Sequence, residues 1–158
     1  MINIGDTFGC KGNKIALKSY HGKYVEAENG GGGSANANRD DTGTWESFTV
    51  EELGGNKVSL KSFNNKYLVA EDASTGYEVN ANRNARGPWE IFTVEKQLGG
   101  TIAFKTHHGR YFVALPDGRL RGDRTAASIW ESFTVECLGN KMITLYNTLF
   151  HGGYKTSY

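Results

Sequence analysis

The chain contains one hexapeptide three times: WESFTV at residues 45–50, WEIFTV at residues 89–94 and WESFTV at residues 130–135. Upstream of each copy lies a short apolar run that ends in lysine: IALK at 15–18, VSLK at 58–61 and IAFK at 102–105. Successive copies are roughly 40 residues apart, a period that is typical of repeat architectures. A group that occurs in all three copies predicts three similar sites on one molecule.

The repeats divide most of the chain into three units, at residues 14–56, 57–100 and 101–140, with four short strands expected in each. In the first unit we expect strands at residues 15–19, 23–28, 35–38 and 46–51, separated by turns rich in Gly, Asn and Asp. Alternation supports strands, because Ile15 and Leu17 share one face and Phe48 and Val50 share another. Closing such a sheet into a barrel removes its exposed edges. The sequence therefore predicts an all-β protein with pseudo-threefold symmetry, a β-trefoil of twelve short strands with almost no helix.

Length and composition bound the remaining possibilities. The 158 residues fit a single domain, 1–158, in which residues 1–13 are expected to add a strand beside the last repeat and residues 141–158 form a C-terminal extension. A net charge of +1 gives no reason to expect a nucleic-acid partner. No apolar run approaches the ~20 residues of a membrane span, so no membrane insertion is expected. No signal peptide is visible, which leaves the compartment open between the cytoplasm and a module of a secreted protein.

The chain has two cysteines, Cys10 and Cys137. Two are too few for a disulfide framework or a zinc ligand set, so free thiols are the favoured interpretation. A bond between them stays open, because the two ends of a closed repeat lie near each other.

The run Gly22-Lys23-Tyr24-Val25, together with ANR at 37–39 and WESF at 45–48, resembles the fascin-like β-trefoil family. The resemblance covers about residues 14–137 and implies two classes of function. Animal members of that family bundle actin filaments, whereas bacterial and fungal members often accompany glycoside hydrolases and bind polysaccharides. In some of those modules a Trp and a Glu from each repeat form the sugar site. The matching pairs here are Trp45 and Glu46, Trp89 and Glu90, and Trp130 and Glu131.

The chemistry of these pairs allows a sugar site. Trp45 has the opposite parity to Phe48 and Val50, so its ring is expected near the surface, where an indole stacks on the C–H face of a sugar. Glu46 shares the parity of the core residues, which leaves two alternatives: a ligand for sugar hydroxyls or an acceptor for main-chain amides. For Trp45 the alternative is packing over the mouth of the barrel.

A second candidate set comes from two copies of the tetrapeptide NANR, at residues 36–39 and 80–83. Amide and guanidinium groups bond sugar hydroxyls well, which makes candidates of Asn38, Arg39, Asn82 and Arg83. Turn chemistry or a polar outer face is the alternative for these residues. The third unit has RGDR at residues 121–124 instead, so its site is expected to differ.

Catalysis is disfavoured, because glycoside hydrolysis needs two carboxylates about 5–10 Å apart and the repeated Glu occurs once per unit. The four histidines (His21, His107, His108 and His151) show no metal-ligand spacing, so neither a metal nor a cofactor is expected. The sequence predicts a non-catalytic carbohydrate-binding module or lectin that binds a β-glucan-like polysaccharide multivalently. The alternative is a fascin-like protein that binds F-actin. The oligomeric state stays open.

Overall fold

The structure is a computed structural model that describes residues 6–139. Twelve strands follow one another along these residues, and no α-helix occurs among them. The strands are β1 (Lys14–Lys18), β2 (Tyr24–Ala27), β3 (Ala35–Arg39), β4 (Phe48–Gly54), β5 (Lys57–Lys61), β6 (Tyr67–Ala70), β7 (Val79–Arg83), β8 (Phe92–Lys96), β9 (Ile102–Lys105), β10 (Tyr111–Ala114), β11 (Leu120–Arg124) and β12 (Thr134–Gly139). Short 3-10 turns are η1 (Asp6–Phe8), η2 (Glu28–Gly30), η3 (Thr44–Glu46), η4 (Ala73–Thr75), η5 (Pro88–Glu90), η6 (Leu98–Gly100) and η7 (Ile129–Glu131).

Six strands form a barrel in which each antiparallel pair joins two successive repeats. β4 pairs with β5, β8 with β9, and β12 with β1. The registers are equivalent, since Thr49 lies opposite Lys61, Thr93 opposite Lys105, and Thr134 opposite Lys18. The pairs β1–β4 and β5–β8, with a bridge between Ile102 and Phe133, complete the ring. The third repeat thus pairs with the first through β12 and β1, which closes the ring as pseudo-threefold symmetry requires.

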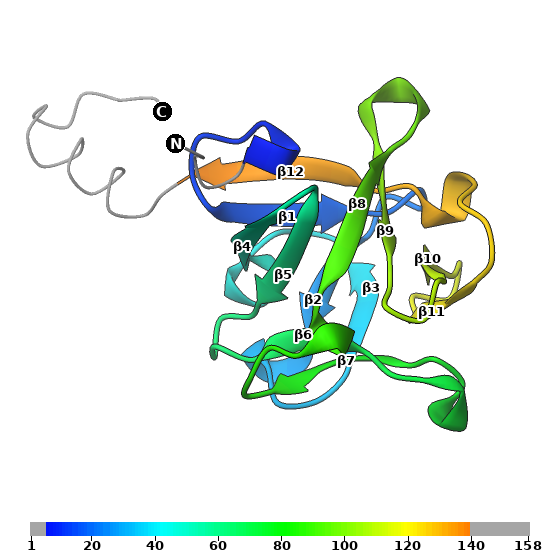
Figure 1. Ribbon diagram of the computed structural model, residues 1–158. Coiled ribbons are helices and arrows are strands. Elements are labelled where there is room, and N and C mark those ends of the chain that lie inside the picture. Colours follow the sequence, from blue (N-terminus) through cyan, green and yellow to red (C-terminus); the bar gives the residue numbers. More distant parts are fainter. Residues whose placement is uncertain (1–5, 140–158) are drawn as a thin grey trace, which may run out of the picture.

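The other six strands form three hairpins, β2–β3, β6–β7 and β10–β11, which close one end of the barrel. In Figure 1, the hairpin β6–β7 lies at the bottom and the pair β1–β12 at the top. The hairpins touch one another through bridges that join Ser34 to Asn80 and Glu78 to Arg121. The backbone at Gly31, whose φ is 122°, passes close to the turn that contains Ser62. A Cβ atom at Gly31 would collide with the side-chain hydroxyl of Ser62. A barrel capped by a triangle of hairpins is a β-trefoil, which confirms the predicted fold class.

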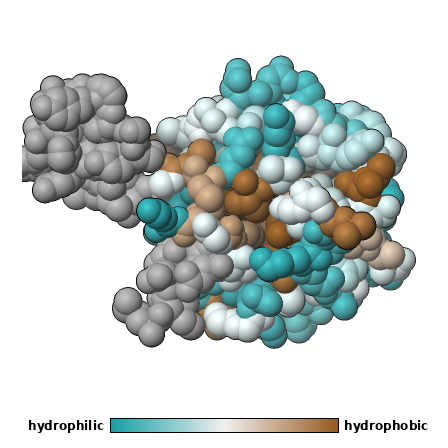
Figure 2. Space-filling model, turned by 90° about the horizontal axis from the view of Figure 1, so that it is seen from above, coloured by the Kyte–Doolittle hydropathy of each residue, from teal (hydrophilic) through white to brown (hydrophobic). Residues whose placement is uncertain are grey.

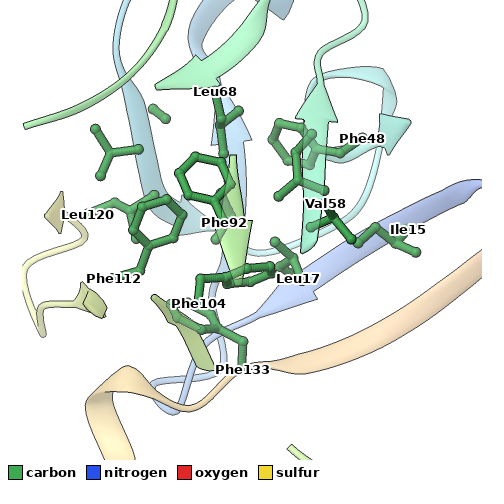
Figure 3. Close-up of a cluster of buried hydrophobic side chains, with 14 of the residues drawn as sticks. Ile15, Leu17, Phe48, Val58, Leu68, Phe92, Phe104, Phe112, Leu120 and Phe133 are labelled. Carbon is green, nitrogen blue, oxygen red and sulfur yellow. The ribbon is translucent and has the colours of Figure 1, made fainter. Parts of the chain in front are cut away.

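The core repeats with the same symmetry (Figure 3). The hexapeptide phenylalanines, Phe48, Phe92 and Phe133, are at most 1% exposed. Their rings pack with the apolar residues of the preceding strands, such as Leu17 and Phe104. The predicted parity is therefore confirmed: the Phe and Val of the hexapeptide face inward.

Two details differ from the sequence-based expectations. The fourth strand of the first unit begins at Phe48 rather than at Glu46, because Thr44–Glu46 form the 3-10 turn η3. The part of the expected N-terminal strand that can be seen, residues 6–13, holds the turn η1 and no strand. Its first five residues, and the C-terminal extension after residue 139, lie outside the described range.

The expectation of free thiols is wrong, because Cys10 and Cys137 form a disulfide with a Cα–Cα distance of 5.5 Å. The reason lies in the closed ring of repeats. The pairs β4–β5 and β8–β9 are each joined by a chain turn, but β1 and β12 come from opposite ends of the sequence. Their pairing places Ile15 opposite Cys137, so the two sulfur atoms come within bonding distance. The disulfide therefore provides a covalent link at the junction of β1 with β12, which no chain turn connects.

The repeated lysines have a structural role on the outside of the barrel. Lys61 lies over the ring of Tyr67, with 5.1 Å between Nζ and the ring centroid, and the Tyr67 hydroxyl donates to Glu51 at 2.8 Å. The same arrangement recurs in Lys18, Tyr24 and Glu136, and in Lys105, Tyr111 and Glu95. Burial and the Glu51 carboxylate raise the pKa of Tyr67. The lysines therefore take part in three equivalent side-chain clusters.

Candidate functional site

Each predicted Glu belongs to a 3-10 turn that leads into the fourth strand of its unit. The carboxylate of Glu46 accepts a hydrogen bond of 2.6 Å from the N–H of Gly43, and only 7% of the residue is exposed. Glu90 accepts likewise from Gly87 at 2.6 Å, and Glu131 from Ser128 at 2.7 Å. A side chain that bonds the amide three residues earlier closes the turn. One oxygen of each predicted acid is therefore used to shape the loop that carries the Trp.

The three tryptophans remain partly exposed at the rim of the barrel. Trp89 packs against His108, with 4.9 Å between ring centroids, and Trp130 packs against His21 at 5.2 Å. Each His comes from the following repeat around the ring and is fixed there by a 3.0 Å bond from Nε2 to a carbonyl oxygen, that of Ala70 or Ala114. One edge of each of these indoles is thus covered and the ring is held in place.

Trp45 has a different neighbour, the guanidinium group of Arg39, whose central carbon lies 5.4 Å from the ring centroid. In the next repeat, Arg83 Nε lies 3.9 Å from the Glu90 carboxylate, and in the third repeat Arg124 Nη1 lies 3.9 Å from that of Glu131. The structure therefore places the predicted Arg39 beside Trp45 and the predicted Arg83 near Glu90, and in the third unit Arg124 lies near Glu131. The cation beside the Trp45 ring also orients donors toward the rim.

The side chains of the two NANR segments are only partly available to a ligand, because some of them bond an acidic side chain of the same unit. Asn36 and Arg39 both donate to Glu28, at 2.9 and 3.1 Å, because a bulge in the β2–β3 pairing brings them to one side. Asn80 and Arg83 bond Glu71 in the same way, at 2.9 and 2.6 Å. The sequence analysis did not identify Glu28 and Glu71, the two acids that accept these hydrogen bonds. The other predicted amides, Asn38 and Asn82, are exposed, and Asn82 accepts from Arg83.

In the third unit these groups line a pocket of about 330 Å³, which we call the Trp130 pocket. The lining consists of Arg124, Ser128, Ile129, Trp130 and Glu131. Leu115 stands in this unit where Glu28 and Glu71 stand in the others, so no equivalent acid anchors Arg124. Arg124 is therefore held by other partners than Arg39 and Arg83, namely Asp123 and Glu131.

The first unit holds a buried acid that has no counterpart in the others. Glu26 is 0% exposed, and neither carboxyl oxygen has a hydrogen-bond partner among the described residues. Burial and then the neighbouring Glu28 raise the pKa of Glu26 to about 8, whereas Arg39, 3.5 Å away, acts in the opposite direction. The pKa of Glu28 is lowered, chiefly by Glu26. At neutral pH the pair therefore holds one proton, on Glu26.

Residues 6–139 contain no group of three or more His, Cys, Asp or Glu side chains placed to hold a metal ion. Within the same residues no helix is long and apolar enough to cross a membrane.

Comparison with known proteins supports the fold and names a family. Residues 10–135 match the family described as Domain of unknown function (DUF7910). None of the curated proteins compared with the chain matches it. Among solved structures, the designed 3-fold symmetric protein ThreeFoil matches with a TM-score of 0.71 and 17% identity, over 79% of this chain and 99% of that chain. At that identity the likeness shows the trefoil alone. The fascin-like resemblance is not shown by these matches and stays a prediction.

Proposed function

Because this chain belongs to the family described as Domain of unknown function (DUF7910), which names no activity, we propose its function from the geometry of its repeats. The proposal is a non-catalytic carbohydrate-binding domain that binds polysaccharide through one Trp-containing rim site in each repeat. The trefoil is a fold often used for carbohydrate binding, which agrees with the proposal.

The observation that carries the proposal is the convergence of a partly exposed indole, a guanidinium group and a carboxylate on one pocket, at Trp130, Arg124 and Glu131. The indole offers an apolar face for the C–H groups of a sugar, and the charged groups offer a donor and an acceptor for its hydroxyls. The Glu has two contacts in the structure: one oxygen of Glu131 accepts from the N–H of Ser128 and closes the turn, and the other lies 3.9 Å from Nη1 of Arg124.

The binding free energy expected for a single site favours a polymer as the ligand. Covering about 100 Å² of an indole contributes roughly 2.5 kcal/mol, and one hydrogen bond to a charged group adds about 1.5–3 kcal/mol. A total near −4 kcal/mol corresponds to a Kd of about 1 mM. Three weak sites on one rigid body gain avidity only when the ligand repeats, as a polysaccharide does. The β-glucan class remains the first candidate, from the resemblance stated above.

The triple substitution Trp45→Ala, Trp89→Ala and Trp130→Ala tests this proposal. We expect it to abolish retention on insoluble glucan, because it removes the stacking surface from all three sites, whereas each single change weakens retention only in part. Retention is measured in a pull-down assay, and circular dichroism checks that a folded β-protein remains. Lys96→Ala, at an exposed position outside the lining of the Trp130 pocket, is the control.

A triple Trp→Phe variant distinguishes a loss of binding from a loss of fold, because it keeps an aromatic ring at each of the three positions. It should retain the fold and bind more weakly than the wild type. If the folded triple Ala variant still binds as the wild type does, the rings serve the fold and the proposed sites are wrong.

A further inference from the structure

A second set of three hollows lies beside the Trp-bearing turns, at the junctions between repeats. They have volumes of about 400, 410 and 470 Å³, and we call them the Phe63, His107 and Tyr20 grooves after one aromatic residue in each. The three share equivalent lining positions: Phe63, His107 and Tyr20 correspond, as do Thr49, Thr93 and Thr134, and Thr44, Pro88 and Ile129. Since unrelated surface hollows have no reason to follow the symmetry, the grooves are a property of the repeat.

Each groove presents a ring to solvent. Tyr20 is 60% exposed and Phe63 is 58% exposed, and His107 is also exposed. The turn that carries each ring is fixed by main-chain hydrogen bonds, such as that from Ser19 to Lys23 at 2.8 Å. The equivalent bond from Ser62 to Lys66 is also 2.8 Å. Exposed rings on a rigid turn offer a stacking surface with little conformational entropy to lose.

The polar lining of the grooves suits a neutral ligand rich in hydroxyl groups. Hydroxyl side chains recur at one accessible position, which holds Thr49, Thr93 and Thr134. A second hydroxyl position, at Ser62, Thr106 and Ser19, is buried and accepts main-chain hydrogen bonds within the turn. A hydroxyl both donates and accepts, as the hydroxyls of a sugar do. None of the residues that line the three grooves is acidic. The Phe63 groove contains one lysine and the His107 groove two, whereas the Tyr20 groove, the largest of the three, has no charged residue in its lining.

The Tyr20 groove adjoins the Trp130 pocket. Ser128 and Ile129 line both of them, and Ile129, which is 54% exposed, stands between. The groove also contains Leu98, which is 95% exposed. Figure 2 shows apolar side chains gathered among polar ones on the face seen there, the mixture that a sugar chain with apolar faces and polar edges matches.

We propose that each junction binds several consecutive units of one sugar chain, with one unit on the Trp face and at least the next two in the adjoining groove, where they stack on Tyr20, Phe63 or His107. The ligand is then an internal stretch of a neutral polysaccharide rather than a single terminal sugar. The inference rests on the proposed function for the class of ligand, but the grooves and their residues are independent of the Trp sites.

The test compares chain lengths. Laminarin, cellulose, xylan and galactomannan are first compared in a pull-down assay, and the disaccharide and hexasaccharide of the most strongly retained polymer then serve as probes. In a ¹H–¹⁵N NMR titration, the hexasaccharide should shift the amide signals of Thr49 and Thr134 as well as those of the tryptophans. The disaccharide should bind about tenfold more weakly, since it cannot cover both surfaces.

The groove variant Tyr20→Ala/Phe63→Ala/His107→Ala should bring the hexasaccharide affinity down to that of the disaccharide. Its three positions are exposed, so the fold should persist, and Lys96→Ala again serves as the control. His107→Ala alone should have the smallest effect of the three single changes, because its ring is the smallest.

Each outcome separates the two proposals. If the hexasaccharide binds no better than the disaccharide, or if the groove variant binds the hexasaccharide like the wild type, the inference is wrong and the Trp sites stand. If the groove variant loses binding and the Trp variants do not, the grooves are the sites and the Trp proposal is wrong. If none of the polymers is retained, both fail.

Discussion

Replacing both disulfide cysteines, as in Cys10→Ser/Cys137→Ser, is expected to lower the free energy of unfolding by about 2–5 kcal/mol. The bond joins residues 127 apart in sequence, and a longer closed loop restricts the unfolded chain more. It also holds together β1 and β12, the one junction hairpin whose strands are not linked by a chain turn. The measurement is urea denaturation followed by Trp fluorescence, with and without reductant.

The reductant arm supplies the control. Reductant should destabilise the wild type to the level of the double variant and leave the variant itself unchanged. Cys137 is exposed, so the reductant can reach the bond. An equal midpoint for the oxidised wild type and the variant would show that the pairing of β1 with β12 closes the barrel unaided.

The second large effect is a fall in stability as pH rises through the titration of Glu26. Its pKa is about 8 in the folded protein and 4.5 as the ordinary value, so the folded state holds one more proton than the unfolded state between these pH values. Stability is therefore lost as pH increases over this window, by at most about 1.4 kcal/mol for each pH unit. Above the folded pKa the loss levels off.

The variant Glu26→Gln isolates this contribution, because it keeps the shape and cannot ionise. Its stability relative to the wild type should increase from pH 5 to pH 8, in urea titrations at each pH. Glu26→Val copies Val69 and Val113, the residues at the equivalent positions of the other repeats, and should show the same pH trend. A difference between Glu26→Gln and the wild type that does not change with pH would mean that Glu26 ionises normally.

The fold was predictable from sequence because the same alternation of inward-facing and outward-facing residues occurs in all three repeats. The parity of Phe48 and Val50 placed the core, and the same parity raised the possibility that Glu46 bonds main-chain amides, which the structure shows. The start of the fourth strand was missed because alternation cannot distinguish the turn η3 from an extended strand.

The disulfide was missed for another reason. Composition gives only the number of cysteines, whereas their distance depends on how β12 returns to β1. Once the ring of repeats is accepted, Cys10 and Cys137 flank its one open junction.

The site was predicted less completely. An Arg does lie near the Trp or the Glu of each unit, but the His residues that cover Trp89 and Trp130 belong to the next repeat and were considered only as metal ligands. The exposed rings of Tyr20 and Phe63 were also missed, although a signal existed: each precedes the turn at the same place in its repeat, as His107 does. Exposure at a turn tip depends on the neighbouring repeat, which sequence periodicity alone does not place.

The most direct test of the account is retention on a panel of neutral polysaccharides at about 0.15 M and about 1 M NaCl, together with co-sedimentation with F-actin. Stacking and hydrogen bonds in the sites persist in salt, whereas binding through exposed lysines and arginines is screened. The account predicts retention on at least one polysaccharide at both salt concentrations and no sedimentation with actin. Salt-sensitive sedimentation with F-actin, without retention on any polysaccharide, would contradict it.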